Sequence, residues 1–226
     1  TMTQVLENSD NVGMVWMIER LGKDRFYDYI DKFGFGKATG IEISGEESGS
    51  IQPKKYVPDV GVATMSFGQG INVTEVQLLQ ATNAIANGGL MVQPHIVKEY
   101  IDKDGKVTVV EPKVVGRAIS EKTAREIGSM MVSVVEKGHG KAARVKGYRI
   151  GGKTGTAQIP LKDRRGYEAN KFTGSFMGFG PLEDPAFSMI VRIDVPKDVI
   201  WAETVAAPTF GELAKQIINY YQLQPD

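Results

Sequence analysis

Hydrophobic residues in the first part of the chain recur at helical spacing and are interrupted by polar, glycine-rich stretches. From residue 11 the apolar positions follow the helical period until Gly22, which predicts a helix over about 11–21. A second short helix is expected over 23–33. Residues 34–70 are rich in glycine, serine and glutamate, so mostly loop is expected there.

Two further helices carry recognisable start and stop signals. Thr74 and Gln77 form the capping-box pattern in front of an apolar run, and the glycine pair at 88–89 is expected to end that helix. Ser120 is placed to cap another helix, which should end before Gly138.

The remaining patterns predict strands and one last helix. Residues 91–110 are expected to form a β-hairpin that turns at the Asp-Gly pair 104–105. Strands are also expected over 148–159, 172–179 and 187–194.

Pro208 is expected to open a terminal helix, because proline is favoured in the first turn. The predicted apolar stripe of this helix consists of Phe210, Leu213, Ile217 and Tyr220. Helices, then antiparallel strands, then a packing helix indicate an α+β fold.

Composition narrows the class of protein. With 226 residues, of which 42% are hydrophobic, the chain suits one domain or one large fragment with a real core. Its 27 basic and 27 acidic residues balance, which argues against a nucleic-acid surface. It has no cysteine, no apolar run long enough to cross a membrane and no signal peptide. Because it opens at Thr1 without a start signal, we expect a truncated or processed end.

The run GYRIGGKTGTAQIP fits two unrelated motifs. From Gly147 to Thr154 it reads G-x-x-x-x-G-K-T, a phosphate-binding loop, whereas from Lys153 it reads K-T-G, an element of penicillin-recognising serine acyltransferases. A phosphate loop must follow a buried strand and open a helix. The preceding residues are basic and small, and Gly155 and Pro160 disfavour a helix. We therefore expect 147–159 to be a strand that binds no nucleotide.

The K-T-G element has a second motif as its companion. Ser9, Asp10 and Asn11 form S-D-N near the N-terminus, in the order that such enzymes require. Taken singly, S-D-N is commonly a turn or helix cap, with Ser9 or Asp10 as the capping residue. The third motif, S-x-x-K, is absent from the 226 residues.

The sequence around both motifs resembles class B penicillin-binding proteins over essentially the whole chain, in the same order. The similar segments are SDNVGMVWMIERLG, SFGQGINVTEVQ, ATNAIANGGLMVQPHIV, GYRIGGKTGTAQ and GSFMGFGPLEDPAFSMIVRIDVP. The resemblance implies an antiparallel sheet flanked by helices, of the penicillin-binding and serine β-lactamase type. It also implies that residues 1–226 are the C-terminal portion of one transpeptidase domain. Residues 1–145 would be mainly the helical subdomain, and 146–226 the sheet strands and terminal helix.

The same resemblance implies that the fold is incomplete here. Two strands and the helix with S-x-x-K would precede Thr1, so that this fragment alone is expected to be inactive. The strand over 187–194 would then have an unpaired edge. An N-terminal anchor would hold the protein at the extracytoplasmic face of the cell membrane.

The resemblance implies that Ser9 and Lys153 are catalytic residues. Ser9 would relay a proton toward the leaving nitrogen, and Lys153 would supply fixed positive charge and tune Ser9. The substrate-binding residues would be Asn11, Thr154, Gly155 and Thr156. The threonine hydroxyls would hold the substrate carboxylate, and the backbone N–H of Thr156 would form half of an oxyanion hole.

The implied reaction is acyl transfer from peptides ending in D-Ala-D-Ala, which cross-links peptidoglycan and makes the protein a target of β-lactams. Stem peptides, the upstream part of the same protein and a glycosyltransferase or division or elongation partner would be its partners. No cofactor is implied, and the two histidines, His95 and His139, lack a metal-ligand partner at useful spacing. Two alternatives stay open: a serine β-lactamase, although no deacylating E-x-x-L-N-type glutamate is found, and a penicillin-binding sensor or scaffold.

Overall fold

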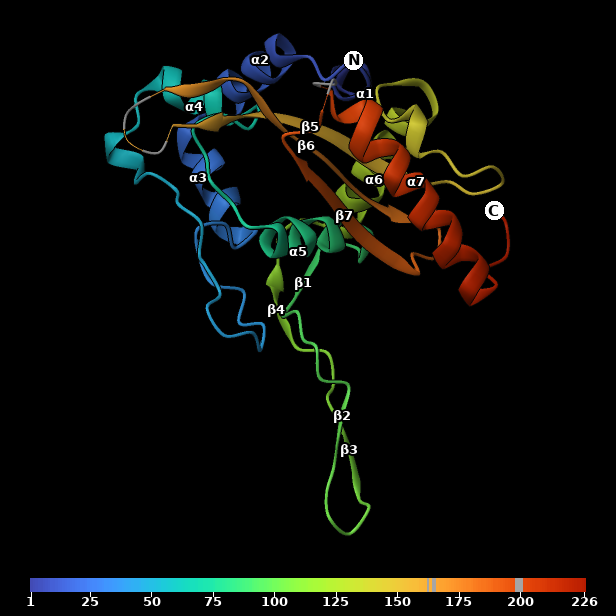
Figure 1. Cartoon of the computed structure of the whole chain (residues 1–226). Coiled ribbons are helices and arrows are strands. Elements are labelled where there is room, and N and C mark those ends of the chain that lie inside the picture. Colours follow the sequence, from blue (N-terminus) through green and yellow to red (C-terminus); the bar gives the residue numbers. More distant parts are fainter. Residues whose placement is uncertain (162, 164–165, 198–200) are drawn as a thin grey trace.

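A three-stranded antiparallel sheet forms the centre of the molecule (Figure 1). The computed structural model describes residues 1–161, 163, 166–197 and 201–226. The strands, in the order β5-β6-β7, are Gly151–Pro160, Tyr167–Gly180 and Phe187–Asp194. The three predicted strands and the α+β class are confirmed, and β6 begins earlier than predicted.

Helices cover both faces of this sheet. They are α5, Glu75–Ala86; α6, Glu121–Lys137; and α7, Ala202–Tyr221. Phe176 of β6 packs against Phe210 of α7 with ring centroids 4.7 Å apart. Phe179 lies three residues further on and so points to the opposite face, where a Cβ on Gly128 of α6 would be 3.4 Å from its ring. The expected sheet flanked by helices is therefore present.

The terminal helix differs from its prediction. Pro208 lies inside α7, which begins at Ala202, and Leu213 and Tyr220 are 39% and 80% exposed. The buried stripe consists of Ala202, Ala206, Ala207, Phe210, Ala214 and Ile218. Small alanine side chains let the helix approach the sheet closely, and this burial offsets the backbone hydrogen bond that a proline removes.

The N-terminal region is a group of short helices. They are α1, Met2–Glu7; α2, Asn11–Leu21; α3, Lys23–Lys32; the 3-10 helix η1, Lys54–Tyr56; and α4, Asp59–Met65. The predictions for α2 and α3 are confirmed. The expectation of mostly loop over 34–70 missed α4, whose Val62 and Met65 are buried in one cluster with Ile18 and Ile30. Tertiary packing stabilises this helix, since it is too short to form alone.

The capping signals that were read from the sequence are present in the structure. The Thr74–Gln77 capping box precedes α5, and the glycine pair after it has positive φ angles of 60° and 88°. The Ser120 hydroxyl caps the start of α6, which ends at Lys137 with Gly138 as its C-cap. A 3-10 helix, η2, Lys141–Ala143, leads from α6 toward β5.

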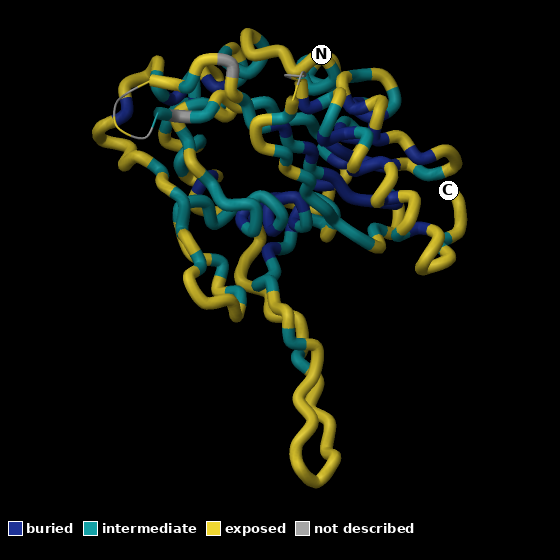
Figure 2. The backbone as a smooth tube through the Cα atoms, viewed as in Figure 1, coloured by how far each residue is buried: buried dark blue, intermediate teal, exposed yellow. Residues whose placement is uncertain are grey.

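A long β-ribbon projects from the body (Figures 1 and 2). It comprises two antiparallel pairs, β1 with β4 and β2 with β3. Their bounds are Leu90–Val92, Glu99–Ile101, Val107–Val109 and Val114–Arg117. The turn contains Gly105 with φ of 77°. The predicted hairpin is confirmed and continues beyond residue 110.

Both outer strands of the central sheet have a free edge in the part of the chain that is described. β5 and β7 each pair only with β6 there, so the predicted unpaired edge of β7 is present. Among the described residues, no helix is long and apolar enough to cross a membrane. The division of the chain near residue 145 stays a prediction.

Candidate active site

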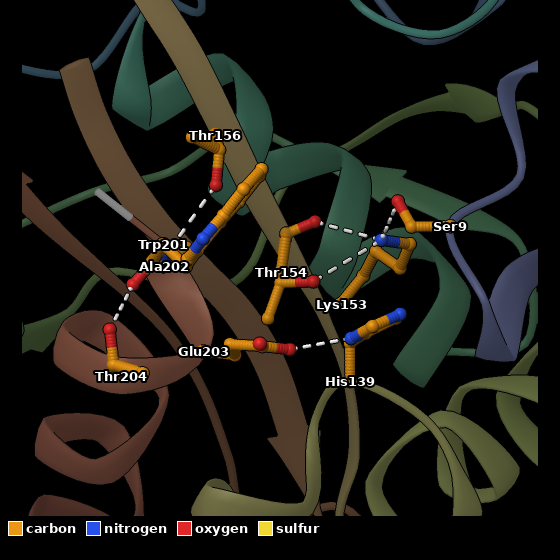
Figure 3. A network of polar contacts seen from close by, with 9 residues as sticks. All are labelled: Ser9, His139, Lys153, Thr154, Thr156, Trp201, Ala202, Glu203 and Thr204. Atoms are coloured by element: carbon orange, nitrogen blue, oxygen red, sulfur yellow. Dashed lines mark hydrogen bonds and ion pairs between the residues drawn. The ribbon is translucent and has the colours of Figure 1, made fainter. Parts of the chain in front are cut away.

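The two sequence motifs meet beside the edge strand β5 (Figure 3). The Nζ of Lys153 donates a hydrogen bond to Ser9 Oγ at 2.8 Å, although 144 residues separate them. Lys153 is in mid-strand, not at the start of a helix. The strand prediction is confirmed. The phosphate-loop interpretation is excluded, because that loop must lead into the N-terminus of a helix.

Ser9 occupies an unusual backbone position between α1 and α2. Its φ is 50°, in the left-handed region that non-glycine residues rarely adopt. Two backbone bonds hold the turn: Ser9 N to Leu6 O at 3.2 Å and Asp10 N to Val5 O at 2.9 Å. Asp10 caps α2 by accepting from Val12 N at 3.0 Å. The capping role expected for Ser9 or Asp10 thus belongs to Asp10, and the hydroxyl of Ser9 is directed to Lys153.

Lys153 sits in a partly dehydrated position. Besides Ser9, its ammonium donates to the Thr154 carbonyl at 2.9 Å and to Thr154 Oγ1 at 3.4 Å. Burial lowers the pKa of Lys153 from its ordinary 10.5 to about 8, because removing an ammonium from water disfavours its charged form. No carboxylate forms an ion pair with Lys153 in the described part of the chain. The group can therefore gain or lose a proton near neutral pH.

Gly155 leaves a bare patch on β5. It pairs with Ser175 of β6, and a Cβ at position 155 would lie 2.7 Å from Ser175 Oγ. Lys153 and Gly155 are two residues apart and so share one face of the strand. An edge strand with little side-chain bulk can accept an extended peptide as an added strand.

Thr156 is tied to the start of α7. Its Oγ1 accepts a hydrogen bond from Ala202 N at 3.3 Å (Figure 3). Since a hydroxyl has one hydrogen and two lone pairs, this contact leaves the O–H of Thr156 able to donate to another group. Thr154 and Thr156 share the other face of β5.

Asn11 is the first residue of α2 and is exposed. Within the described residues, its side-chain amide makes no hydrogen bond. An amide that can donate and accept is thus available on the Ser9 side of the site. The structure brings Ser9, Lys153 and Thr154 into direct contact; the roles of all six candidate residues stay predictions.

One feature of the site was missed by the sequence patterns. Nδ1 of His139 lies 2.5 Å from Oε2 of Glu203 in the first turn of α7 (Figure 3). These residues are 64 positions apart, and no spacing rule relates them. Among the described residues, no group of three or more acidic, histidine or cysteine side chains is arranged to hold a metal ion.

A strand lysine opposite a serine in a helix–helix turn, beside an edge strand with K-T-G, is the arrangement of penicillin-recognising acyltransferases. Comparison with known families agrees: the profile described as "Penicillin binding protein transpeptidase domain" matches residues 1–218. The chain therefore belongs to the penicillin-binding protein transpeptidase domain family.

Individual relatives place it with the class B proteins. The chain is 42% identical over its whole length to stage V sporulation protein D of Bacillus subtilis, covering 35% of that protein. It is 33% identical, again over its whole length, to the peptidoglycan D,D-transpeptidase FtsI of Escherichia coli, covering 37% of it. The chain thus spans about a third of the length of the curated relatives that it matches.

Solved structures show the same fold. Penicillin-binding protein 3 of Mycobacterium tuberculosis complexed with aztreonam superposes with a TM-score of 0.92 at 30% identity, over all of this chain and 52% of that one. The same protein complexed with ampicillin gives the same TM-score and coverage. That protein therefore binds β-lactams.

Proposed function

We propose that the protein containing this chain is a serine-type DD-transpeptidase that cross-links peptidoglycan and is a target of β-lactams. The observation that carries the proposal is the 2.8 Å contact between Lys153 Nζ and Ser9 Oγ beside the edge strand. It joins the two motifs that acyl transfer needs on this fold. The nucleophile and its base, in S-x-x-K, would lie in a part of the protein upstream of Thr1.

In the proposed first step, the upstream serine oxygen attacks the carbonyl carbon of the penultimate D-alanine. A C–O ester bond forms, the C–N bond to the terminal D-alanine breaks, and the serine proton goes to the leaving nitrogen. Ser9 would pass this proton, because its hydroxyl can accept and donate at once. In the second step an acceptor amine attacks the ester, forming the new amide and returning the proton to the serine.

The residues on β5 would bind the substrate. The Lys153 charge and the O–H groups of Thr154 and Thr156 would hold its terminal carboxylate, and the bare backbone at Gly155 would pair with it as an added strand. The backbone N–H of Thr156 would stabilise the oxyanion together with that of the missing serine. Such a donor contributes about 3 to 4 kcal/mol in other acyl-transfer sites. Asn11 would hold the penultimate amide from the opposite side.

The same sites would take a β-lactam, whose carboxylate and strained amide resemble the peptide terminus. The stem peptide is an extracytoplasmic substrate, so the protein would work at the outer face of the cell membrane, anchored by an upstream segment. The glycosyltransferase that makes the glycan strands, within a division or elongation complex, would be its partner.

A fluorescent penicillin tests the proposal. We expect covalent labelling of the full-length protein and none of residues 1–226 alone, since the nucleophilic serine, its lysine base and half of the oxyanion hole would lie upstream. A label that persists for hours fits a transpeptidase or a penicillin-binding sensor, whereas release within seconds would mean a β-lactamase. Labelling of residues 1–226 alone would show that the nucleophile is in this chain and overturn the assigned roles.

A further inference from the structure

His139 lies where three elements of the candidate site meet. It follows Gly138, the C-cap residue of α6. Its backbone N–H donates to the carbonyl oxygen of Glu7, the last residue of α1, at 3.1 Å. Its side chain meets Glu203 of α7 (Figure 3). His139 therefore contacts both the end of α1, just before Ser9, and the first turn of α7, whose Ala202 is bonded to Thr156.

The Glu7 side of this junction is held firmly. Glu7 comes two residues before Ser9, and its carboxylate accepts a hydrogen bond from Ser133 of α6. Gly138 packs so closely on Glu7 that a Cβ at 138 would overlap the Glu7 carbonyl oxygen. With the bond from His139, these contacts anchor the end of α1 and hence the left-handed turn at Ser9.

The Glu203 side depends more on His139. In the described part of the chain, α7 has no side-chain cap at Trp201. Glu203 is the second residue of α7, directly after Ala202, whose N–H is bonded to Thr156 Oγ1. A carboxylate is favoured at this end of a helix, and a histidine donor fixes where it lies. His139 thus holds the first turn of α7 from outside the helix.

The His139 and Glu203 side chains are 49% and 39% exposed, so the contact lies at the surface. A surface pair of this kind contributes little to stability. The pair also links two elements that are 64 residues apart, at the point where α7 touches β5. Its effect is therefore expected on the geometry of the site more than on stability.

We propose that His139 is a positioning residue, which ties the Ser9 turn to the start of α7 and so orients the Thr156 hydroxyl toward a bound carboxylate. The proposal rests on the transpeptidase function above. His139 holds Glu203 in the first turn of α7, and the neighbouring Ala202 N–H donates to Thr156 Oγ1. While Thr156 Oγ1 accepts this bond, the hydroxyl hydrogen of Thr156 points to the ligand. Without the His139–Glu203 contact, the Thr156 hydroxyl is free to rotate.

Rapid acylation kinetics of the full-length protein with a fluorescent penicillin test this assignment. The dissociation constant of the initial complex and the acylation rate constant are measured separately. His139→Ala should raise the dissociation constant about fivefold to tenfold, as expected for one hydrogen bond made less effective, with the acylation rate constant changed less than twofold. His95→Ala is the matched control, because the other histidine is on the ribbon, where its ring hydrogen-bonds to Val97 O.

Two further variants separate positioning from general damage. In His139→Asn, Nδ2 takes the place of the imidazole Nδ1 and can still donate to Glu203, so this change should restore wild-type binding. In a Thr156→Val background, His139→Ala should have no further effect, since the hydroxyl through which it acts is gone.

Equal losses for His139→Ala and His139→Asn, or additive losses with Thr156→Val, would overturn the assignment. So would a fall in the acylation rate constant alone. If wild-type protein is not acylated at all, the transpeptidase function itself fails, and this inference fails with it. Glu203→Ala should reproduce His139→Ala and covers the case in which the histidine variant does not fold.

Discussion

Lys153 of β5 donates a hydrogen bond to Ser9 in the turn between α1 and α2, and burial lowers the pKa of that lysine to about 8. When Lys153 is charged, it donates to Ser9; when it is neutral, the Ser9 hydroxyl can donate to it. The same contact thus provides charge for a carboxylate and a path for a proton.

Replacing Lys153 should slow acylation of the full-length protein by at least about a hundredfold. Lys153→Ala removes both the carboxylate charge and the proton path, and loss of a charged hydrogen-bonding partner in a dry site costs about 3 kcal/mol or more. The rate of labelling by fluorescent penicillin measures the effect.

Lys153→Arg is the matched control for this change. It keeps the positive charge but does not release a proton at accessible pH. We expect binding to recover and acylation to stay slow. Full recovery of acylation would show that only the charge matters and that Ser9 relays no proton through residue 153.

Stability should depend on pH through Lys153. Its folded-state pKa of about 8 is below the ordinary 10.5, so between these values the unfolded chain binds more protons than the folded one. The free energy of unfolding should therefore rise as the pH increases through this window. The buried charge costs most below pH 8, where both states are protonated.

Lys153→Met isolates this effect. The variant should be more stable than the wild type near pH 7, and the difference should shrink between about pH 8 and 10.5. Denaturant midpoints of both proteins across this range provide the measurement. A constant difference would mean that the Lys153 pKa is not lowered by folding.

Gly155→Ala should impair both stability and acylation, for two separable reasons. The added Cβ would be 2.7 Å from Ser175 Oγ, and it would also stand where a ligand strand is expected to lie. Removing the clash with Ser175→Ala should restore the melting temperature but not the rate of penicillin labelling. If that second change restores both, Gly155 matters only for packing within the sheet.

Gly138→Ala should disturb the site from a distance. Its Cβ would overlap the Glu7 carbonyl, so α1 must shift, and a cost of about 1–3 kcal/mol is expected for such overpacking. Labelling should slow as well, because Glu7 leads directly to Ser9.

Gly116→Ala on the ribbon serves as the comparison for that change. Nothing lies within 4 Å of the position that its Cβ would take, and the melting temperature should change by less than about 2 °C. A similar result for Gly138→Ala would contradict the close contact between α6 and α1.

Local patterns predicted much of the fold because their causes are local. The Thr74–Gln77 box and the Ser120 cap involve groups three residues apart, and both helices begin where these residues indicate. The period of apolar residues located α2, and Gly155 and Pro160 disfavoured a helix over the segment that forms β5. For the same reason, the choice between phosphate loop and K-T-G strand was possible from sequence.

Patterns failed where packing decides. Pro208 was expected to begin a helix, but burial of an alanine stripe extends α7 back to Ala202. The short helix α4 has weak local signals and is stabilised by contacts of Val62 and Met65 with α2 and α3. In both cases the stabilising surface belongs to distant segments, which a local window does not contain.

The sequence by itself determined that S-D-N and K-T-G are both present in the required order, and therefore that Ser9, Asn11 and Lys153 are candidates for one site. Only the tertiary structure decided that Lys153 reaches Ser9, that Ala202 holds Thr156, and that His139 meets Glu203. These contacts join residues 144, 46 and 64 positions apart. Their geometry depends on how helices pack on the sheet, because local propensity sets the secondary structure of a segment but not its distance from another segment.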